Sequence, residues 1–158
     1  MTVSIILDGM ACKFSSAHFL AGHPKCGRLH GHNYHASVKI TGSLNKNGMV
    51  LDFVEAKQAI QQELEELDHR LLLPATSSRM VIMEAGGNTT IEFDKKSYSI
   101  PTSDVLLLPL PAITAEMLAK YLHSKIKARF PGFKIVVRVS ETCSAAAEYG
   151  ENGNGGTI

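Results

Sequence analysis

Three histidines and a cysteine lie within ten residues of the sequence, in the stretch CGRLHGHNYH from Cys26 to His35. His30 and His32 are two residues apart, so in an extended segment their side chains point to the same side. Two imidazoles that converge in this way can each ligate Zn²⁺ at about 2.0–2.1 Å. The spacing therefore favours a metal site over a set of unrelated solvated or core histidines.

A third metal ligand has to come from another segment, and His18 in FSSAHFL is the candidate because this segment is expected to run beside the first. Three neutral histidines leave one tetrahedral position open for water or substrate, which is typical of a catalytic zinc site. Non-haem iron is less favoured, because it would want a carboxylate ligand. On spacing alone, a three-histidine hydratase is a further alternative.

Cys26 lies in a loop rich in Gly, Lys and Arg, just before the histidine pair. A thiolate is a better base and nucleophile than a thiol, and positive charge nearby favours it. Lys25, Arg28 and a metal ion would act in this direction, which favours a reactive role over that of a small buried hydrophobic residue. We interpret Cys12 and Cys143, which lack such surroundings, as packing residues.

Two other segments carry groups suited to acid–base chemistry or ligand binding. Asp68 and His69 are adjacent and form a carboxylate–imidazole pair if the preceding helix ends there. The alternative is that His69 serves as a favourable charge at the helix C-terminus. Glu141 follows an apolar strand, where its carboxylate could accept two hydrogen bonds from an amino-heterocycle or could be solvated.

The composition is that of an ordinary globular protein. With 158 residues, 44% hydrophobic and 20% charged, the chain is long enough for one domain with a real core. A net charge of +1 gives no indication of nucleic acid or of an anionic membrane surface, and the apolar runs are too short to span a bilayer. Three cysteines without a secretion signal predict a reduced, cytoplasmic protein.

Hydrophobic periodicity predicts strands and two helices that would position these groups. Strands are expected over 3–15, 33–41, 49–52, 133–140 and 145–149, with further strands between 77 and 108. Helices are expected over 53–67, capped by Asp52, and from about Thr114 to just before Pro131. This order predicts an α+β fold with an antiparallel sheet and both helices on one face. Residues 1–150 would form one domain, with an inserted hairpin at about 77–108 and a disordered tail at 151–158.

Taken together and in order, the motifs FSSAH, CGRLHGH, LDF, LDHR, T-A-E and SET resemble those of the 6-pyruvoyl-tetrahydropterin synthase superfamily. The three-residue gap between Cys26 and His30, and Cys143 in ETC, resemble its 6-carboxy-tetrahydropterin synthase branch, which serves the queuosine pathway. The animal pyruvoyl enzymes have a longer gap. The resemblance covers most of residues 10–150.

The resemblance implies a tunnelling fold (T-fold), in which subunits join edge to edge into β-barrels. The typical assembly is a homohexamer of two stacked trimers with active sites at subunit interfaces. It implies zinc held by the three histidines His18, His30 and His32. The other implied roles are catalytic base or proton shuttle for Cys26, acid–base partners for Asp68 and His69, and pterin anchor for Glu141.

The implied substrate is 7,8-dihydroneopterin triphosphate, and Thr114 and Glu116 fall where the pterin-contacting Thr and Glu of the family lie. The carboxy branch would release triphosphate and acetaldehyde. The long segment Ala75–Leu110, and Ala112-Ile113-Thr114 in place of Pro-Thr, depart from the pattern and bear on the substrate more than on the metal. The alternatives are a pyruvoyl synthase, an aldolase-like variant that usually has Glu at the cysteine position, and a non-catalytic zinc- or pterin-binding protein.

Overall fold

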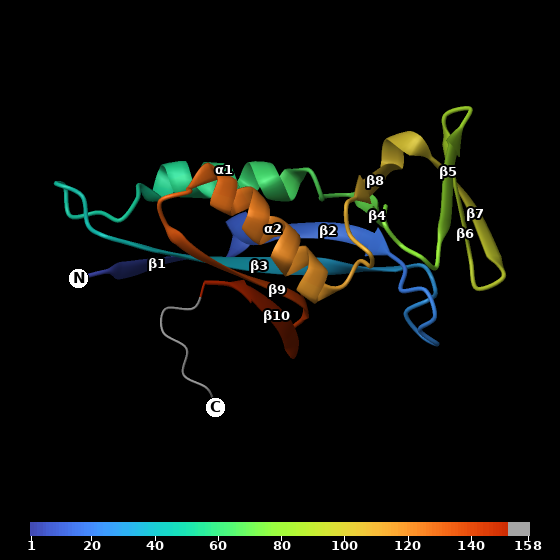
Figure 1. The fold of residues 1–158 in the computed structure, drawn as a ribbon, viewed down its shortest axis with the longest axis horizontal. Helices are drawn as coiled ribbons and strands as arrows, with labels where there is room; N and C mark the ends of the chain where they lie inside the picture. Colours follow the sequence, from blue (N-terminus) through green and yellow to red (C-terminus); the bar gives the residue numbers. More distant parts are fainter. Residues whose placement is uncertain (152–158) are drawn as a thin grey trace.

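Two helices lie on one face of a seven-stranded sheet (Figure 1). The computed structural model describes residues 1–151, so most of the tail expected at 151–158 lies outside the described residues. The elements are β1 (Val3–Leu7), β2 (Lys13–His18), β3 (His30–Gly42), α1 (Phe53–Glu65), β4 (Arg70–Pro74), β8 (Val105–Leu108), α2 (Ala115–Arg129), β9 (Lys134–Thr142) and β10 (Ala145–Gly150). The strand order is β10-β9-β3-β2-β4-β8, with β1 beside β3. The α+β class and the helix placement agree with the sequence prediction.

The main hydrophobic core fills the space between the helices and the sheet. In β3 every second residue from Tyr34 to Ile40 is buried, as expected for a strand with one face on a core. These residues share one cluster with Ile60 of α1 and Leu122 of α2. No helix in the described range is both long and apolar enough to cross a membrane.

Each helix begins at a capping side chain. The Asp52 carboxylate accepts a hydrogen bond from the backbone N–H of Val54 at 2.7 Å, and the Thr114 hydroxyl accepts one from Met117 at 3.3 Å. These N–H groups lie in the first turn, where no helical carbonyl can reach them. The predicted cap at Asp52 is confirmed, and α1 ends at Glu65, two residues earlier than predicted.

The sheet is mixed rather than wholly antiparallel. β4 runs parallel to both β2 and β8, whereas the other pairs in the sheet are antiparallel. The sequence of β4 is RLLLP, and its last four residues are buried. Such a continuous apolar run has no alternation that would identify it as a strand, and it is typical of parallel strands covered on both faces.

Two local predictions are wrong. Residues 49–52 do not form a strand, because both edges of β3 are already paired, with β1 and β2 on one side and β9 on the other. They close a turn in which the Asn45 N–H donates to the Met49 carbonyl, and they then lead into α1. The strand expected at 3–15 is interrupted by a 3₁₀ turn at Met10–Cys12.

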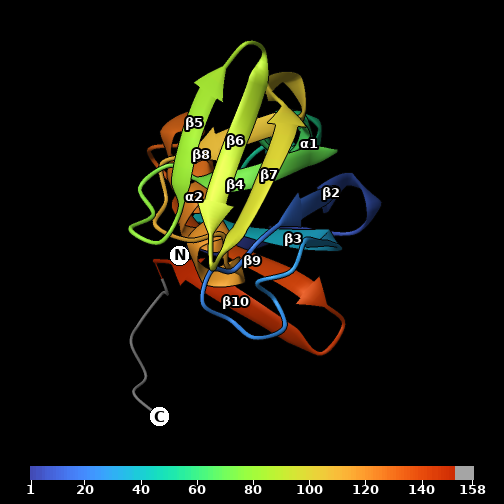
Figure 2. The same ribbon diagram turned by 90° about the vertical axis from the view of Figure 1, so that its right-hand side faces the viewer.

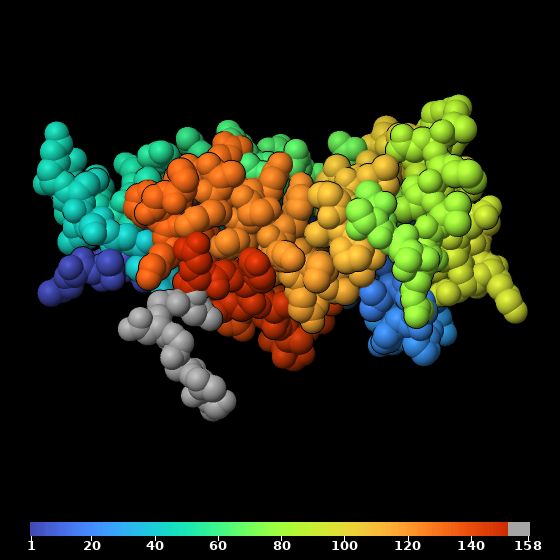
Figure 3. Space-filling view, viewed as in Figure 1, coloured from blue at the N-terminus to red at the C-terminus, as the bar shows by residue number. Residues whose placement is uncertain are grey.

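A second, three-stranded antiparallel sheet stands at one end of the molecule (Figure 2). It consists of β5 (Val81–Ala85), β6 (Asn88–Phe93) and β7 (Lys96–Pro101), one strand more than the predicted hairpin. We call it the small sheet. It packs on Phe19, Leu71 and Leu73 in a cluster separate from the main core. In the space-filling view it lies, green to yellow, against the blue loop that precedes β3 (Figure 3).

Candidate metal centre and active site

Strand register brings the three predicted metal ligands together. In the antiparallel pairing of β2 with β3, His18 lies opposite His30, and Ser16 lies opposite His32. The His18 ring is therefore 4.4 Å from the His30 ring and 5.3 Å from the His32 ring, measured between centroids. One ligand atom from each histidine lies within 4.8 Å of the others. The three rings converge as the sequence predicts.

Gly31 allows the two strands to approach closely at this point. A Cβ on Gly31 would lie 2.7 Å from the carbonyl oxygen of Ser16 on the facing strand, closer than real Cβ atoms come. Because Gly31 has no side chain, β3 can stay close to β2, and His30 and His32 remain beside it. This is a local reason for the sequence H-G-H.

Hydrogen bonds orient two of the rings. The Nδ1–H of His18 donates to the Ile113 carbonyl at 2.8 Å, and the Nδ1–H of His30 donates to the Arg28 carbonyl at 2.7 Å. In a neutral imidazole whose Nδ1 carries the proton, the Nε2 lone pair is free to ligate a metal. Nε2 of His18 is buried and has no hydrogen-bond partner in the described part of the chain. A bound cation would satisfy this atom.

The electrostatics of His18 also suit a ligand. Burial, reinforced by the neighbouring His30 and His32, lowers the pKa of His18 from 6.5 to about 4 despite its hydrogen bond to the Ile113 carbonyl. The ring is therefore neutral at physiological pH, which metal ligation requires. The group His18, His30 and His32 fits a metal ion that accepts nitrogen ligands and leaves coordination positions open.

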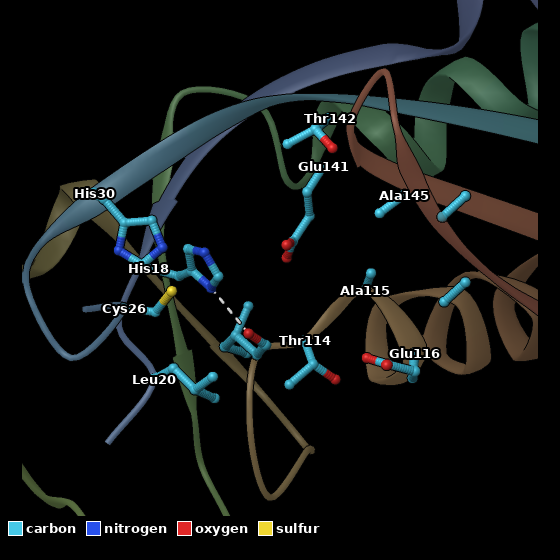
Figure 4. Close-up of a pocket in the computed structure, with 13 residues that line it drawn as sticks. His18, Leu20, Cys26, His30, Thr114, Ala115, Glu116, Glu141, Thr142 and Ala145 are labelled. Carbon is cyan, nitrogen blue, oxygen red and sulfur yellow. Dashed lines mark hydrogen bonds between the residues drawn. The ribbon is translucent and has the colours of Figure 1, made fainter. Parts of the chain in front are cut away.

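Beside the histidines lies a cavity of about 390 Å³ (Figure 4). Its polar lining includes His18, Cys26, His30, Thr114, Glu116 and Glu141. Figure 4 shows the Cys26 sulfur pointing toward the two histidine rings, while the Glu141 carboxylate enters the cavity from the opposite wall. Thr114 and Glu116 stand at the start of α2 on the remaining side. Six of the nine predicted site residues therefore share one cavity.

Glu141 links this cavity to the third histidine. Its Oε2 lies 3.9 Å from Nε2 of His32. Behind them, the Tyr34 hydroxyl is buried, and this burial together with the Glu141 carboxylate raises the pKa of Tyr34 above its usual range. Tyr34 is therefore neutral at physiological pH. The Glu141 carboxylate lines the cavity, where its oxygen atoms can accept hydrogen bonds from a ligand.

Asp68 and His69 form the predicted pair, but they do not line the cavity that contains Cys26. The His69 Nδ1–H donates to Asp68 Oδ2 at 2.7 Å, and Asp68 Oδ1 accepts the Ser15 N–H at 2.7 Å. The Ser15 hydrogen bond, followed by the His69 interactions, lowers the pKa of Asp68. His69 has a φ of 55°, a left-handed conformation that turns the chain out of the helix and allows two adjacent side chains to meet.

The His69 side chain is 82% exposed and lines a different hollow, whose lining also includes Ser15, Asn33, Arg70, Asp104 and the predicted ligand His32. Ser15 and Asn33 sit at the odd-numbered positions of β2 and β3, whereas the metal ligands sit at the even-numbered ones. The pair therefore faces the opposite side of the sheet from Cys26 within one chain. A single chain does not bring the three predicted catalytic residues together.

A family model described as 6-pyruvoyl tetrahydropterin synthase matches residues 10–152. The protein belongs to this family. A relative from Haemophilus influenzae named 6-carboxy-5,6,7,8-tetrahydropterin synthase is 30% identical over 145 residues, covering 87% of this chain and 94% of its own. A Methanocaldococcus jannaschii relative, which carries the same name as a provisional assignment, is 40% identical over 144 residues, 87% of this chain and 88% of its own.

Solved structures of tetrahydropterin synthases have the same fold. The crystal structure of 6-pyruvoyl tetrahydropterin synthase from Plasmodium vivax has a TM-score of 0.89 and 26% identity, covering 96% of this chain and 99% of its own. The Plasmodium falciparum enzyme has a TM-score of 0.88 and 25% identity, covering 95% of this chain and 98% of its own. The resemblance that the sequence motifs carry is confirmed.

Some features of this family member escape the sequence analysis. Ala145, Ala146 and Ala147 of β10 line the cavity and leave its wall flat, and their only signal is a run of small residues after Glu141. Cys12 is buried, as predicted, but Cys143 is exposed in the turn between β9 and β10, so its interpretation as a packing residue is wrong. The apolar strand before it ends at Thr142, and the turn carries Cys143 away from the core.

Proposed function

We propose that the protein is a zinc-dependent lyase, a 6-carboxy-tetrahydropterin synthase. It would convert 7,8-dihydroneopterin triphosphate and one water molecule to 6-carboxy-5,6,7,8-tetrahydropterin, with release of triphosphate and acetaldehyde. The observation that carries the proposal is the cavity that joins His18 and His30 of the histidine group to Cys26 and Glu141. The names of the relatives at 30–40% identity support the carboxy branch.

Zinc is the metal that we propose for His18, His30 and His32, because three neutral imidazoles form the ligand set of known catalytic zinc sites. When bound, zinc would act as a Lewis acid toward oxygen atoms of the substrate side chain. The chain supplies the conditions for this: hydrogen bonds from His18 and His30 to backbone carbonyls fix the rings, and burial keeps His18 neutral.

Glu141 would anchor the pterin. A carboxylate can accept two parallel hydrogen bonds from the 2-amino group and the N3–H of a pterin, a planar and charge-assisted arrangement. The alanines of β10 leave space for a flat ring beside Glu141, and Thr114 and Glu116 offer hydrogen-bonding groups across the cavity. The substrate side chain would then extend toward the histidines and Cys26.

Cys26 would be the proton carrier. Its sulfur points toward the histidine rings, where the substrate side chain would lie (Figure 4). In the thiolate form, Sγ can take a proton from a side-chain carbon and return one to the pterin ring while the double bond moves. Binding alone would not need a thiol at this position, which disfavours the non-catalytic alternative.

The Asp68–His69 pair would act on the cavity of a neighbouring subunit. It is exposed, preformed by hydrogen bonds and directed away from the Cys26 of its own chain. Within the described residues, β10 and β8 end the sheet and leave free edges that a second copy can extend. We therefore propose a homo-oligomer built edge to edge, a hexamer of two trimers, with active sites between subunits. The cytoplasmic location and the queuosine pathway stay predictions of the sequence.

Product analysis tests this function. Zinc-loaded protein is incubated with 7,8-dihydroneopterin triphosphate and the products are identified by mass, with Cys26→Ala as the inactive control that should keep fold and metal. We expect triphosphate, acetaldehyde and 6-carboxy-tetrahydropterin. A pyruvoyl product without carbon loss would instead favour pyruvoyl synthase activity, the second candidate, which the fold match to the Plasmodium vivax enzyme favours. Substrate binding without triphosphate release would contradict both.

A further inference from the structure

The loop between β2 and β3, residues 19–29, carries Cys26 between the proposed metal ligands and is called here the cysteine loop. It folds on itself: the Leu20 N–H donates to the Cys26 carbonyl at 2.8 Å, and the Gly27 N–H donates to the His23 carbonyl at 2.9 Å. The Cys26 N–H donates to Nδ1 of His23 at 2.9 Å. These bonds fix the internal shape of the loop, but its position over the cavity requires contacts with another element.

The small sheet provides two such contacts, one on each side of Cys26. Oδ2 of Asp94 accepts the Gly22 N–H at 2.7 Å, and the Lys96 ammonium donates to the Gly27 carbonyl at 2.7 Å. Both bonds involve a charged partner and are therefore stronger than neutral hydrogen bonds. In Figures 1 and 2 the cysteine loop lies beside the turn that joins β6 to β7.

The geometry of the β6–β7 turn places the side chains of Asp94 and Lys96 next to the cysteine loop. Phe93 pairs with Lys96, so Asp94 and Lys95 alone form the turn, and both have positive φ, 48° and 62°. Two positive φ values define a type I′ hairpin turn, in which Gly is the usual second residue and a lysine is strained. Asp tolerates this conformation and carries an acceptor, which explains its place at the first position.

A glycine in the cysteine loop, Gly22, allows a side chain next to the small sheet to approach the loop backbone closely. Gly22 has a φ of 81°, and the guanidinium of Arg79, just before β5, occupies the place where a side chain at Gly22 would begin. Phe19, which follows the ligand His18, packs on Phe93 with ring centroids 5.1 Å apart. The small sheet therefore contacts the chain at Phe19, Gly22 and Gly27, from the residue after His18 to the residue after Cys26.

We propose that Asp94 and Lys96 are positioning residues for Cys26, and that the small sheet is a brace for the cysteine loop. Neither residue lines the cavity, so they would act through the backbone at Gly22 and Gly27 and not on the substrate. The catalytic part of this inference rests on the proposed role of Cys26. The structural part, that the brace holds the loop in place, does not.

The test compares Asp94→Ala and Lys96→Met with the conservative variants Asp94→Asn and Lys96→Arg, which keep an acceptor and a donor. Lys95→Gly is the matched control, since it relaxes the same turn without removing either contact. Hydrogen exchange measured by mass spectrometry in residues 20–28 reports on the loop. Steady-state kcat and KM with 7,8-dihydroneopterin triphosphate report on catalysis.

We expect exchange in residues 20–28 to become about tenfold faster in Asp94→Ala and Lys96→Met, which corresponds to about 1.4 kcal/mol. We expect kcat to fall about tenfold while KM changes less than about twofold, because the loop is misplaced but the pterin anchor is intact. Asp94→Asn and Lys96→Arg should recover most of both effects, and Lys95→Gly should show neither.

Unchanged exchange in residues 20–28 would overturn the brace, whatever happens to the melting temperature. Faster exchange with unchanged kcat would overturn the positioning role of Asp94 and Lys96. If the wild-type protein shows no turnover at all, the proposed function fails, while the exchange comparison still decides the brace. Should Asp94→Ala or Lys96→Met not fold, Asp94→Ser or Lys96→Gln replaces it, since each shortens or discharges the side chain and weakens the bond to Gly22 or Gly27. Exchange in residues 20–28 that is no faster than in Lys95→Gly would then overturn the brace.

Discussion

Among the histidines of β3, position along the strand decides which ones reach the candidate metal centre. His30 and His32 occupy even-numbered positions and face His18, whereas His35 occupies an odd-numbered position and its Nε2 lies 2.6 Å from the Asp8 carboxylate on the other face. The three side chains are chemically identical and five residues apart at most. Strand geometry alone therefore separates the predicted ligands from a histidine that contacts a surface carboxylate.

The first prediction uses this separation. We expect His30→Ala and His32→Ala each to reduce bound zinc from about one ion per chain to less than about a tenth, because two imidazoles seldom hold zinc against dialysis. His35→Ala should keep its metal. Metal content after dialysis, measured by plasma emission spectroscopy, checks this, and near wild-type zinc in the first two variants would refute the ligand assignment.

The buried ring of His18 leads to a prediction about pH. The unfolded chain protonates this histidine near pH 6.5, but the folded metal-free protein does so only near pH 4. Below pH 6.5 the unfolded chain thus binds more protons, and the free energy of unfolding falls as pH falls, by roughly 3 kcal/mol once pH 4 is reached. Urea unfolding of metal-free protein between pH 7 and pH 4 measures this. His18→Asn should flatten the dependence, and an equally steep dependence in that variant would contradict the assignment.

Glu141 should act on substrate binding more than on turnover. Removing a carboxylate that accepts two hydrogen bonds costs about 1.5–3 kcal/mol, or roughly ten- to hundredfold in KM. Glu141→Gln should be nearly as poor as Glu141→Ala, because its amide presents donors to the donors of the pterin edge. Glu148→Gln is the matched control, because Glu148 is an exposed carboxylate on the neighbouring strand β10. An unchanged KM in both Glu141 variants would remove the anchor role.

At the scale of elements, the sequence predicts those that are amphipathic and misses those that are not. The alternation from Tyr34 to Ile40 identifies β3, and the apolar stripe through Ile60 identifies α1. β4 lacks alternation and is missed, and its parallel pairing with β2 depends on contacts between segments far apart in the chain. The histidine cluster could be predicted because a two-residue spacing is local. The part of the cavity wall formed by β10 could not be predicted, because it depends on how β10 packs beside α2 in the folded chain.

Helix capping gives a prediction at this scale. Asp52→Ala removes the side-chain acceptor for the Val54 N–H and should lower the free energy of unfolding by about 1 kcal/mol. Asp52→Ser should retain most of that stability. Because Asp52 lies outside the cavity, kcat and KM should stay at wild-type values in both variants. Urea unfolding and steady-state kinetics check the two halves of this expectation, and equal stability of the Ala and Ser variants would contradict the capping role.

At the scale of the whole molecule, the nine predicted site residues divide between two hollows: six line the cavity, His32 and His69 line the second hollow, and Asp68 is hydrogen-bonded to His69. The cavity contains Cys26 and Glu141, the proposed pterin anchor, whereas Asp68 and His69 face the other way. The sequence places all of them in order along the chain, but it cannot tell whether they meet within one chain or between chains. An oligomer in which a neighbour presents its Asp68–His69 pair to the cavity reconciles the two groups.

Mixed oligomers test this arrangement directly. Cys26→Ala and His69→Ala should each be inactive alone, since each lacks one half of every site. After the two are unfolded together and refolded in equal amounts, half of the cavities contain Cys26 and half of the neighbours present His69. If neighbours assort at random, about a quarter of wild-type activity should return. Activity that stays at the level of the two inactive variants would mean that Cys26 and His69 act within one chain. Full activity of His69→Ala alone would mean that His69 has no part in catalysis. A mixture of Cys26→Ala with Cys26→Ser provides the control, because no combination of these chains restores the thiol.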